Sequence, residues 1–100
     1  MAQIATRWPT EAERQRVEKI IAQHDNDFER PNGVRRIAFS FREDQAGNPA
    51  VYLEIFVDKD LPPTKENIDD LNDFVQVIIN DILADDKFEY WPYARTLVED

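Results

Sequence analysis

The chain has few side chains of the kind that perform covalent chemistry. His24 is its only histidine, Ser40 is its only serine, and cysteine is absent. A serine nucleophile needs a neighbouring base, yet Ser40 is expected on the outer face of a strand, whereas His24 belongs to the apolar stripe of a helix. We therefore expect His24 to be a partly buried, hydrogen-bonded structural histidine. The sequence predicts no catalytic residue.

The aspartates Asp58 and Asp60 form the second candidate site, at the end of an expected strand. With Asp69 or Asp70 from the helix that follows, their carboxylates could hold Mg²⁺. The spacing departs from that of a calcium-binding loop, because Pro62 stands where the third ligand would be. Aspartates at a strand end before Leu-Pro-Pro more often form turns. We therefore expect neither a metal site nor a cofactor, and a Mg²⁺-dependent enzyme is the least favoured alternative.

Two segments show the apolar spacing of amphipathic helices. In residues 10–27, Thr10 and Glu13 have the spacing of a capping box. The apolar stripe consists of Val17, Ile20, Ile21 and His24 and continues to Phe28, directly after the helix. In residues 64–84, Thr64 follows two prolines, which favours a helix start, and the stripe consists of Ile68, Leu71, Val75, Ile78, Ile79 and Ile82. Each stripe is expected to face a sheet.

Alternating apolar and polar residues predict a hairpin between the helices, with strands at residues 34–43 and 50–58. The intervening residues 44–48 have turn chemistry. An antiparallel register that places Phe41 opposite Val51 gathers the apolar positions on one face: Ile37, Phe39, Phe41, Val51, Leu53 and Ile55. A last strand is expected over residues 88–98, at an edge or a bulge because Pro92 lacks an amide donor. A place beside either the second or the first strand fits the sequence.

The predicted order is α-β-β-α-β. It implies an α+β fold, a two-layer α/β sandwich whose three-stranded, mostly antiparallel sheet carries both helices on one face. Residues 10–98 form a single domain, and residues 1–9 form an N-terminal arm. The order resembles that of K-homology and BolA-like domains in topology alone. The Gly-x-x-Gly loop of K-homology domains is absent, since Gly33 and Gly47 stand apart, and no family is assigned.

The net charge of −9 narrows the choice of partners. It disfavours nucleic acid and anionic lipid, which bind through Lys and Arg, and it permits attraction to basic proteins. No apolar run approaches the roughly 18 residues of a membrane span. A chain without cysteine forms no disulfides, which favours a reducing compartment. We therefore expect a soluble cytoplasmic protein without a nucleic-acid or membrane partner.

The negative charge is concentrated in the second half of the chain. Residues 1–50 hold eight acidic and eight basic side chains, whereas residues 51–100 hold thirteen acidic and four basic ones. Much of the excess loads the second helix, through Asp69, Asp70 and Asp73. These three aspartates are candidates for steering a basic partner, and a merely solvated helix face is the alternative. Asp85 and Asp86 follow the helix, where acids oppose its macrodipole.

Aromatic side chains are expected on the face of the sheet opposite the helices. Tyr52 and Phe56 alternate with the core positions of their strand, Arg36 flanks them, and Trp91 comes from the last strand. Aromatic residues with arginine are typical of protein interfaces. The alternative is that the N-terminal arm, with Trp8, folds across these rings.

The leading hypothesis is a non-enzymatic acidic protein-binding module that docks on a basic protein surface. Inhibitors, immunity proteins, antitoxins and accessory subunits act in this way. The predicted partner-binding residues are Asp69, Asp70, Asp73, Tyr52, Phe56, Trp91 and Arg36. The alternative is a self-associating subunit of an oligomeric complex, such as a homodimer joined through the outer sheet face.

Overall fold

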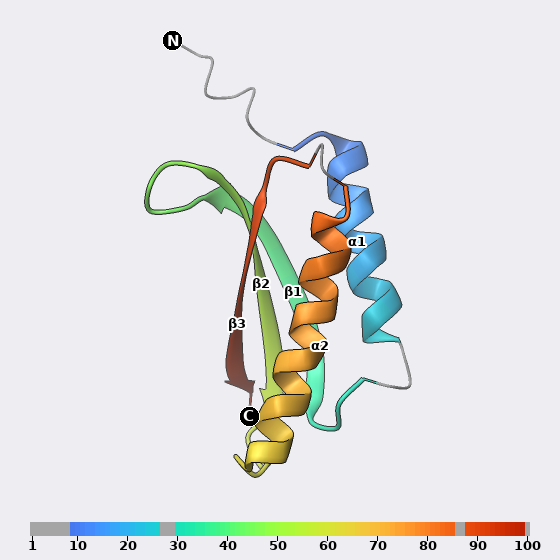
Figure 1. The fold of residues 1–100 in the computed structure, drawn as a ribbon, viewed down its shortest axis with the longest axis vertical. Helices are drawn as coiled ribbons and strands as arrows, with labels where there is room; N and C mark the ends of the chain where they lie inside the picture. Colours follow the sequence, from blue (N-terminus) through green and yellow to red (C-terminus); the bar gives the residue numbers. More distant parts are fainter. Residues whose placement is uncertain (1–8, 27–29, 86–87, 100) are drawn as a thin grey trace.

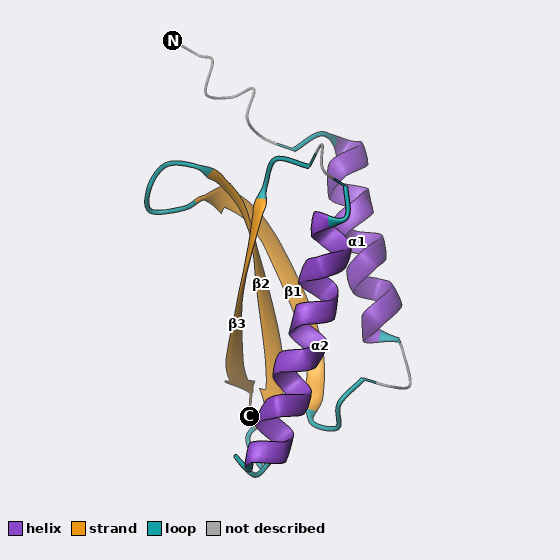
Figure 2. Cartoon of the chain, in the orientation of Figure 1, coloured by secondary structure: helices purple, strands orange, loops and turns teal. Residues whose placement is uncertain are grey.

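The expected elements are present in a computed structural model, which describes residues 9–26, 30–85 and 88–99 (Figure 1). In chain order they are α1 (Glu11–Asp25), β1 (Val34–Glu43), β2 (Pro49–Asp58), α2 (Lys65–Leu83) and β3 (Trp91–Glu99). Both helices lie on the same side of the three-stranded sheet (Figure 2). The α+β class and the two-layer arrangement are thus confirmed.

Both helices begin at the threonines that the sequence indicates. The Thr10 hydroxyl accepts from the Glu13 amide at 3.1 Å, and the Glu13 carboxylate accepts from the Thr10 amide at 2.8 Å, which completes a capping box. The Thr64 hydroxyl accepts from the Asn67 amide at 3.1 Å. Each contact satisfies an amide that the first helical turn leaves unpaired. The expected stripe residue Phe28 lies outside the described residues.

The hairpin has the predicted register. β1 and β2 are antiparallel, with Phe41 opposite Val51, Phe39 opposite Leu53 and Ile37 opposite Ile55. The Asp44 carboxylate holds the turn, because one of its oxygens accepts from the amides of Ala46 at 3.0 Å and Asn48 at 2.9 Å. In this register the alternate β2 residues Val51, Leu53 and Ile55 face the helices.

The last strand, β3, lies beside β2 and runs parallel to it, so the sheet contains one antiparallel and one parallel pair. The sequence left this position open between two strands. β2 is the central strand, and every one of its residues is accordingly buried or half-buried, as expected of a strand flanked on both sides. Pro92 therefore lies in an edge strand, as predicted.

The core fills the space between the helices and the inner face of the sheet. Its fully buried side chains come from both layers: Val17, Val51, Leu53, Ile55, Ile78 and Ile82. One member of the expected α2 stripe departs from it, because Ile68 is 48% exposed. Ile68 lies in the first turn of α2, well before the fully buried Ile78 and Ile82, and its expected burial was wrong.

Candidate interaction surfaces

The outward face of α2 carries the three aspartates predicted to steer a partner. Asp69, Asp70 and Asp73 are all exposed. Asp69 accepts from the Lys65 ammonium at 2.7 Å, a pair one turn apart on the same helix. No residue in the described part of the chain forms an ion pair with Asp70 or Asp73. This face therefore keeps most of its negative charge.

An apolar side chain interrupts the acidic face. Val77 is 47% exposed, one helical turn after Asp73 and one turn before Asp81. The exposure of Val77 and its spacing of four residues from Asp73 place it on the solvent side of the helix, although the next residue, Ile78, is fully buried. We call Glu66, Asp69, Asp70, Asp73 and Val77 the acidic face of α2.

The last turn of α2 is held by α1. The Arg16 guanidinium donates to the carbonyl oxygens of Asp81 at 2.9 Å and Ile82 at 3.1 Å, and it lies 5.4 Å from the centre of the Phe88 ring. α2 has no basic residue in its own last turn. Arg16 therefore supplies the cation that favours a helix C-terminus, where the sequence places the opposing Asp85.

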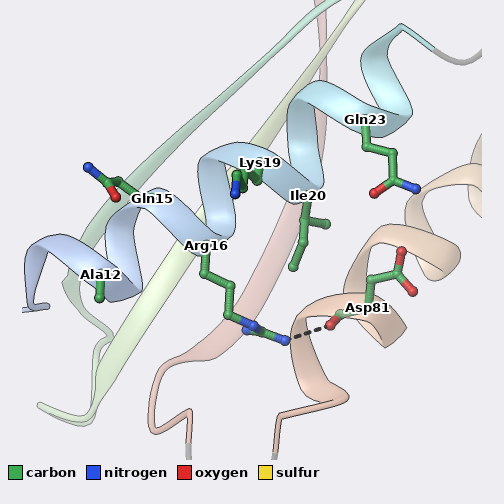
Figure 3. Close-up of a pocket in the computed structure, with 7 residues that line it drawn as sticks. All are labelled: Ala12, Gln15, Arg16, Lys19, Ile20, Gln23 and Asp81. Carbon is green, nitrogen blue, oxygen red and sulfur yellow. Dashed lines mark hydrogen bonds between the residues drawn. The ribbon is translucent and has the colours of Figure 1, made fainter.

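A shallow depression of about 580 Å³ lies beside this contact (Figure 3). Arg16 reaches across it to α2, while Lys19, Gln23 and Ile20 line the α1 side. His24 lies nearby, with its Nε2 atom 2.6 Å from a carboxylate oxygen of Asp81 and its side chain 12% exposed. The contacts of Arg16 and Asp81 at this depression join the two helices, which is a structural role.

The outer face of the sheet covers its own aromatic rings. The Arg36 guanidinium lies 3.8 Å from the centre of the Phe56 ring, and that of Arg42 lies 4.1 Å from the centre of the Tyr52 ring. Both rings are half-buried. Stacked guanidinium groups stabilise such rings electrostatically and shield them from water. The sequence predicts that the helices leave these rings uncovered. Arginines of the sheet itself cover them instead.

Charged pairs tie the three strands together on this outer face. Arg36 Nε donates to Glu99 at 3.0 Å, which links β1 to β3 across Phe56. Arg95 donates to Glu54 at 2.6 Å, which links β3 to β2. The charges of the outer face are therefore largely paired within the molecule.

Two tyrosines and the hairpin turn form a second depression, of about 380 Å³. Tyr52 and Tyr93 stack with ring centres 5.2 Å apart, and the Tyr93 hydroxyl donates to Asp44 at 2.9 Å. The Asn48 amide and this hydroxyl hold the pKa of the Asp44 carboxyl below its usual value. The same hydrogen bond raises the pKa of Tyr93 above its usual value, since ionisation would place two negative charges side by side.

The remaining predicted ring, Trp91, is 56% exposed at the start of β3. It lies opposite Ala50, on the same face as Tyr93 two residues later. Tyr52, Phe56, Trp91 and Arg36 thus share the outer sheet face. The three aspartates belong to α2, on the other side of the sheet (Figure 1). The predicted partner-binding residues therefore form two surfaces rather than one.

Sequence reasoning missed the side chains that complete these surfaces. Arg42 and Tyr93 are not among the predicted partner-binding residues, although the alternation that places Tyr52 on the outer face could have indicated both. Val77 could have been found as the apolar residue in the polar arc of the helix. No local pattern indicates Arg16, because its partners lie more than 60 residues away.

Of the residues considered for chemistry, the two aspartates share a turn, and the serine and the histidine lie apart. Asp58 accepts from the Asp60 amide at 2.9 Å, the turn-forming role that the sequence favours. Ser40 is exposed on the outer sheet face opposite Tyr52, whereas His24 lies in the helix layer, so the sheet separates them. Within residues 9–26, 30–85 and 88–99, no three His, Asp or Glu side chains are grouped to hold a metal ion.

Comparison with known proteins adds no family. No protein-family model matches the chain, and a search of curated proteins finds no similar sequence. None of the helices in the described segments is long and apolar enough to span a bilayer. A functional proposal therefore depends on the two surfaces themselves.

Proposed function

We propose that this chain is a non-enzymatic protein-binding module that docks on a basic protein surface through the acidic face of α2. The observation that carries the proposal is the pair of exposed aspartates, Asp70 and Asp73, which have no ion-pair partner among the described residues, beside the exposed Val77. Inhibitors, antitoxins, immunity proteins and accessory subunits are the classes of protein that fit such a surface.

The acidic face combines the two components that an interface needs. Unpaired carboxylates raise the rate of encounter with a basic partner and fix its orientation. An exposed apolar side chain such as Val77 offers apolar surface, and burying this surface in the complex slows dissociation. α2 also presents these groups on a helix anchored at both ends, by Thr64 and by Arg16, so little conformational entropy is lost when the partner binds.

The outer sheet face is the weaker candidate for the same partner. Tyr52 and Phe56 are already covered by guanidinium groups, and a partner would have to displace these arginines to reach them. Trp91 is the ring that a partner could contact directly, since it is the most exposed aromatic side chain of the described residues. A single flat partner surface cannot touch this face and the acidic face of α2 together.

The test compares two triple variants that change net charge equally. The first, Asp69→Asn/Asp70→Asn/Asp73→Asn, neutralises the acidic face. The second, Glu18→Gln/Glu43→Gln/Glu89→Gln, neutralises three exposed carboxylates elsewhere on the molecule. Each variant and the unmodified chain are immobilised and exposed to extract of the native host at low salt, and bound proteins are quantified.

The proposal predicts a basic protein that the unmodified chain and the glutamine variant retain and the asparagine variant loses. Circular dichroism of all three chains must show the same helix content, since the altered side chains are on the surface. If the two variants bind the same proteins equally, the position of the carboxylates does not matter, and the proposal is wrong.

A further inference from the structure

β3 is an edge strand that is open along its whole length. It pairs with β2 on one side, and no described residue pairs with it on the other (Figure 1). Its side chains are exposed on both faces of the sheet, at Trp91, Tyr93, Ala94, Arg95, Thr96 and Val98. A strand with unpaired amides and carbonyls along one side is a template for another strand.

The opposite edge of the sheet is protected. β1 carries two arginines directly after its first residue, Arg35 and Arg36, and its pairing with β2 is irregular between Val34 and Arg36. Charged side chains and bulges are the devices by which proteins keep an edge strand from pairing with other chains. The pairing of β3 with β2 has no bulge, and its two charged residues, Arg95 and Glu99, are held in ion pairs within the sheet. The edge formed by β3 is therefore better suited than the edge formed by β1 to pair with a strand of another chain.

We propose that β3 pairs with β3 of a second copy of this chain, antiparallel and about a two-fold axis at Leu97, to form a continuous six-stranded sheet. The interface is isologous, so each contact occurs twice. This inference stands apart from the proposed function, because it uses a different strand and leaves the acidic face of α2 uncovered.

Charge complementarity supports a second copy of this chain and this register. With Leu97 at the axis, Arg95 lies opposite Glu99 of the second copy. Within each copy Arg95 already holds Glu54 at 2.6 Å, and Glu99 accepts from Arg36 at 3.0 Å. Pairing would therefore extend an alternating row of opposite charges across the outer face, from Glu54 and Arg95 of one copy to Glu99 and Arg36 of the other. A two-fold axis at Arg95 would instead oppose two arginines, which is unfavourable.

Apolar side chains near the proposed axis support the same pairing. Val98 is 69% exposed although it lies opposite Val57 on the helix-covered face. Ile68 is 48% exposed on the flank of α2 that points away from α1, since Phe74 and Asp81 on the other flank contact His24. The first turns of α2 and the end of β3 lie at the same end of the molecule (Figure 1). The two-fold axis would bring four such side chains together and remove them from water.

Single-cysteine variants test the register, because the chain has no cysteine of its own. Cysteines opposite each other in an antiparallel pair lie within disulfide distance. We expect mild oxidation to give about tenfold more covalent dimer for Leu97→Cys than for Thr96→Cys or for the control Ser40→Cys, which is exposed on β1. Equal cross-linking of the three variants would overturn the proposal.

Sedimentation of the unmodified chain tests the proposal without a substitution in the interface. We expect the dimer fraction to rise with protein concentration. Thr96→Lys places a charge opposite the apolar Val98 of the second copy in the proposed register and should lower the association constant at least about tenfold, whereas Ser40→Lys should leave it unchanged. A chain that sediments as a monomer at every concentration would overturn the proposal, and the edge would then be open to a strand of another protein.

Discussion

At the scale of single residues, arginine side chains on the outer sheet face cover aromatic rings that the sequence pattern alone would predict to be exposed. Alternation along β2 predicts correctly that Tyr52 and Phe56 point away from the helices. It does not predict that the guanidinium groups of Arg42 and Arg36 lie over these rings, because the direction of a long side chain depends on neighbouring strands. The cover therefore becomes visible only when the strands are aligned.

The first prediction concerns the cover of Phe56. Arg36→Ala removes the guanidinium from the ring and breaks the pair with Glu99, and should lower the free energy of unfolding by about 1 kcal/mol. The neighbouring Arg35→Ala, whose contact with Asp58 is long at 3.4 Å, should cost less than about 0.5 kcal/mol. Urea unfolding of the two variants measures the difference. Equal losses of stability would mean that the Arg36 stack contributes nothing.

The second prediction concerns the hydrogen bond between Tyr93 and Asp44. The pKa of Tyr93 is raised above the ordinary 10.0, so the neutral phenol persists at pH values where other tyrosines begin to ionise. Asp44→Asn removes the negative charge and should lower the pKa of Tyr93 toward 10.0, as read from phenolate absorbance. A Tyr93→Phe variant identifies the signal of this residue. An unchanged titration in Asp44→Asn would show that the hydrogen bond is absent in solution.

The same contact also shifts the pKa of its carboxyl partner, Asp44, in the opposite direction. The pKa of the Asp44 carboxyl is lowered below 3.8, mainly by the Asn48 amide. The stability that ionised Asp44 contributes is therefore complete above the unfolded-state pKa and is lost as the pH falls through the lowered folded-state pKa. Asp44→Asn should remove this part of the acid-dependent change in stability.

At the scale of elements, the two glycines are a matched pair for the third prediction. Gly33 has φ +94° and a Cβ added there would lie 2.9 Å from the Leu61 side chain, whereas Gly47 has φ +83° and open space around it. Gly47→Ala should destabilise by about 1 kcal/mol from backbone strain alone. Gly33→Ala should cost more, since Leu61 must also shift. Thermal unfolding that ranks the two variants in the reverse order would contradict this account.

The fourth prediction concerns the cap that α1 provides for α2. Arg16→Met keeps the length of the side chain and removes its bonds to the carbonyls of Asp81 and Ile82, at a cost of about 1–2 kcal/mol. Hydrogen exchange should accelerate in the last turn of α2 more than in its first. Lys19→Met, an exposed neighbour on α1, is the control. Uniform acceleration along α2 in both variants would show that Arg16 does not act as a cap.

The sequence predicts the secondary structure well. It predicts the surfaces less well, because they depend on contacts between distant segments. The Thr10 capping box and the Phe41–Val51 register depend on the spacing of residues that are close in sequence, so the sequence alone predicts them. The place of β3 beside β2, the exposure of Ile68 and the reach of Arg16 depend on how distant segments pack. The acidic residues of α2 were visible as a group, and their separation from the rings of the outer sheet face was not.

At the scale of the whole molecule, the protein has two sides with different chemistry. The helix side presents unpaired carboxylates on α2, and the sheet side pairs its charges internally. The proposed pairing of β3 strands would leave both acidic faces of the dimer free. A partner with two basic sites could then bind both copies, with a gain in avidity that a monomer lacks.

The most direct test of the account is the salt dependence of the association rate constant with the basic protein captured by the unmodified chain. The account predicts a rate constant that falls steeply between low and physiological ionic strength. In Asp69→Asn/Asp70→Asn/Asp73→Asn it should be about tenfold lower at low salt and nearly flat, while Glu18→Gln/Glu43→Gln/Glu89→Gln should keep most of the slope. A slope that the asparagine variant retains in full would show that the acidic face of α2 does not meet the partner.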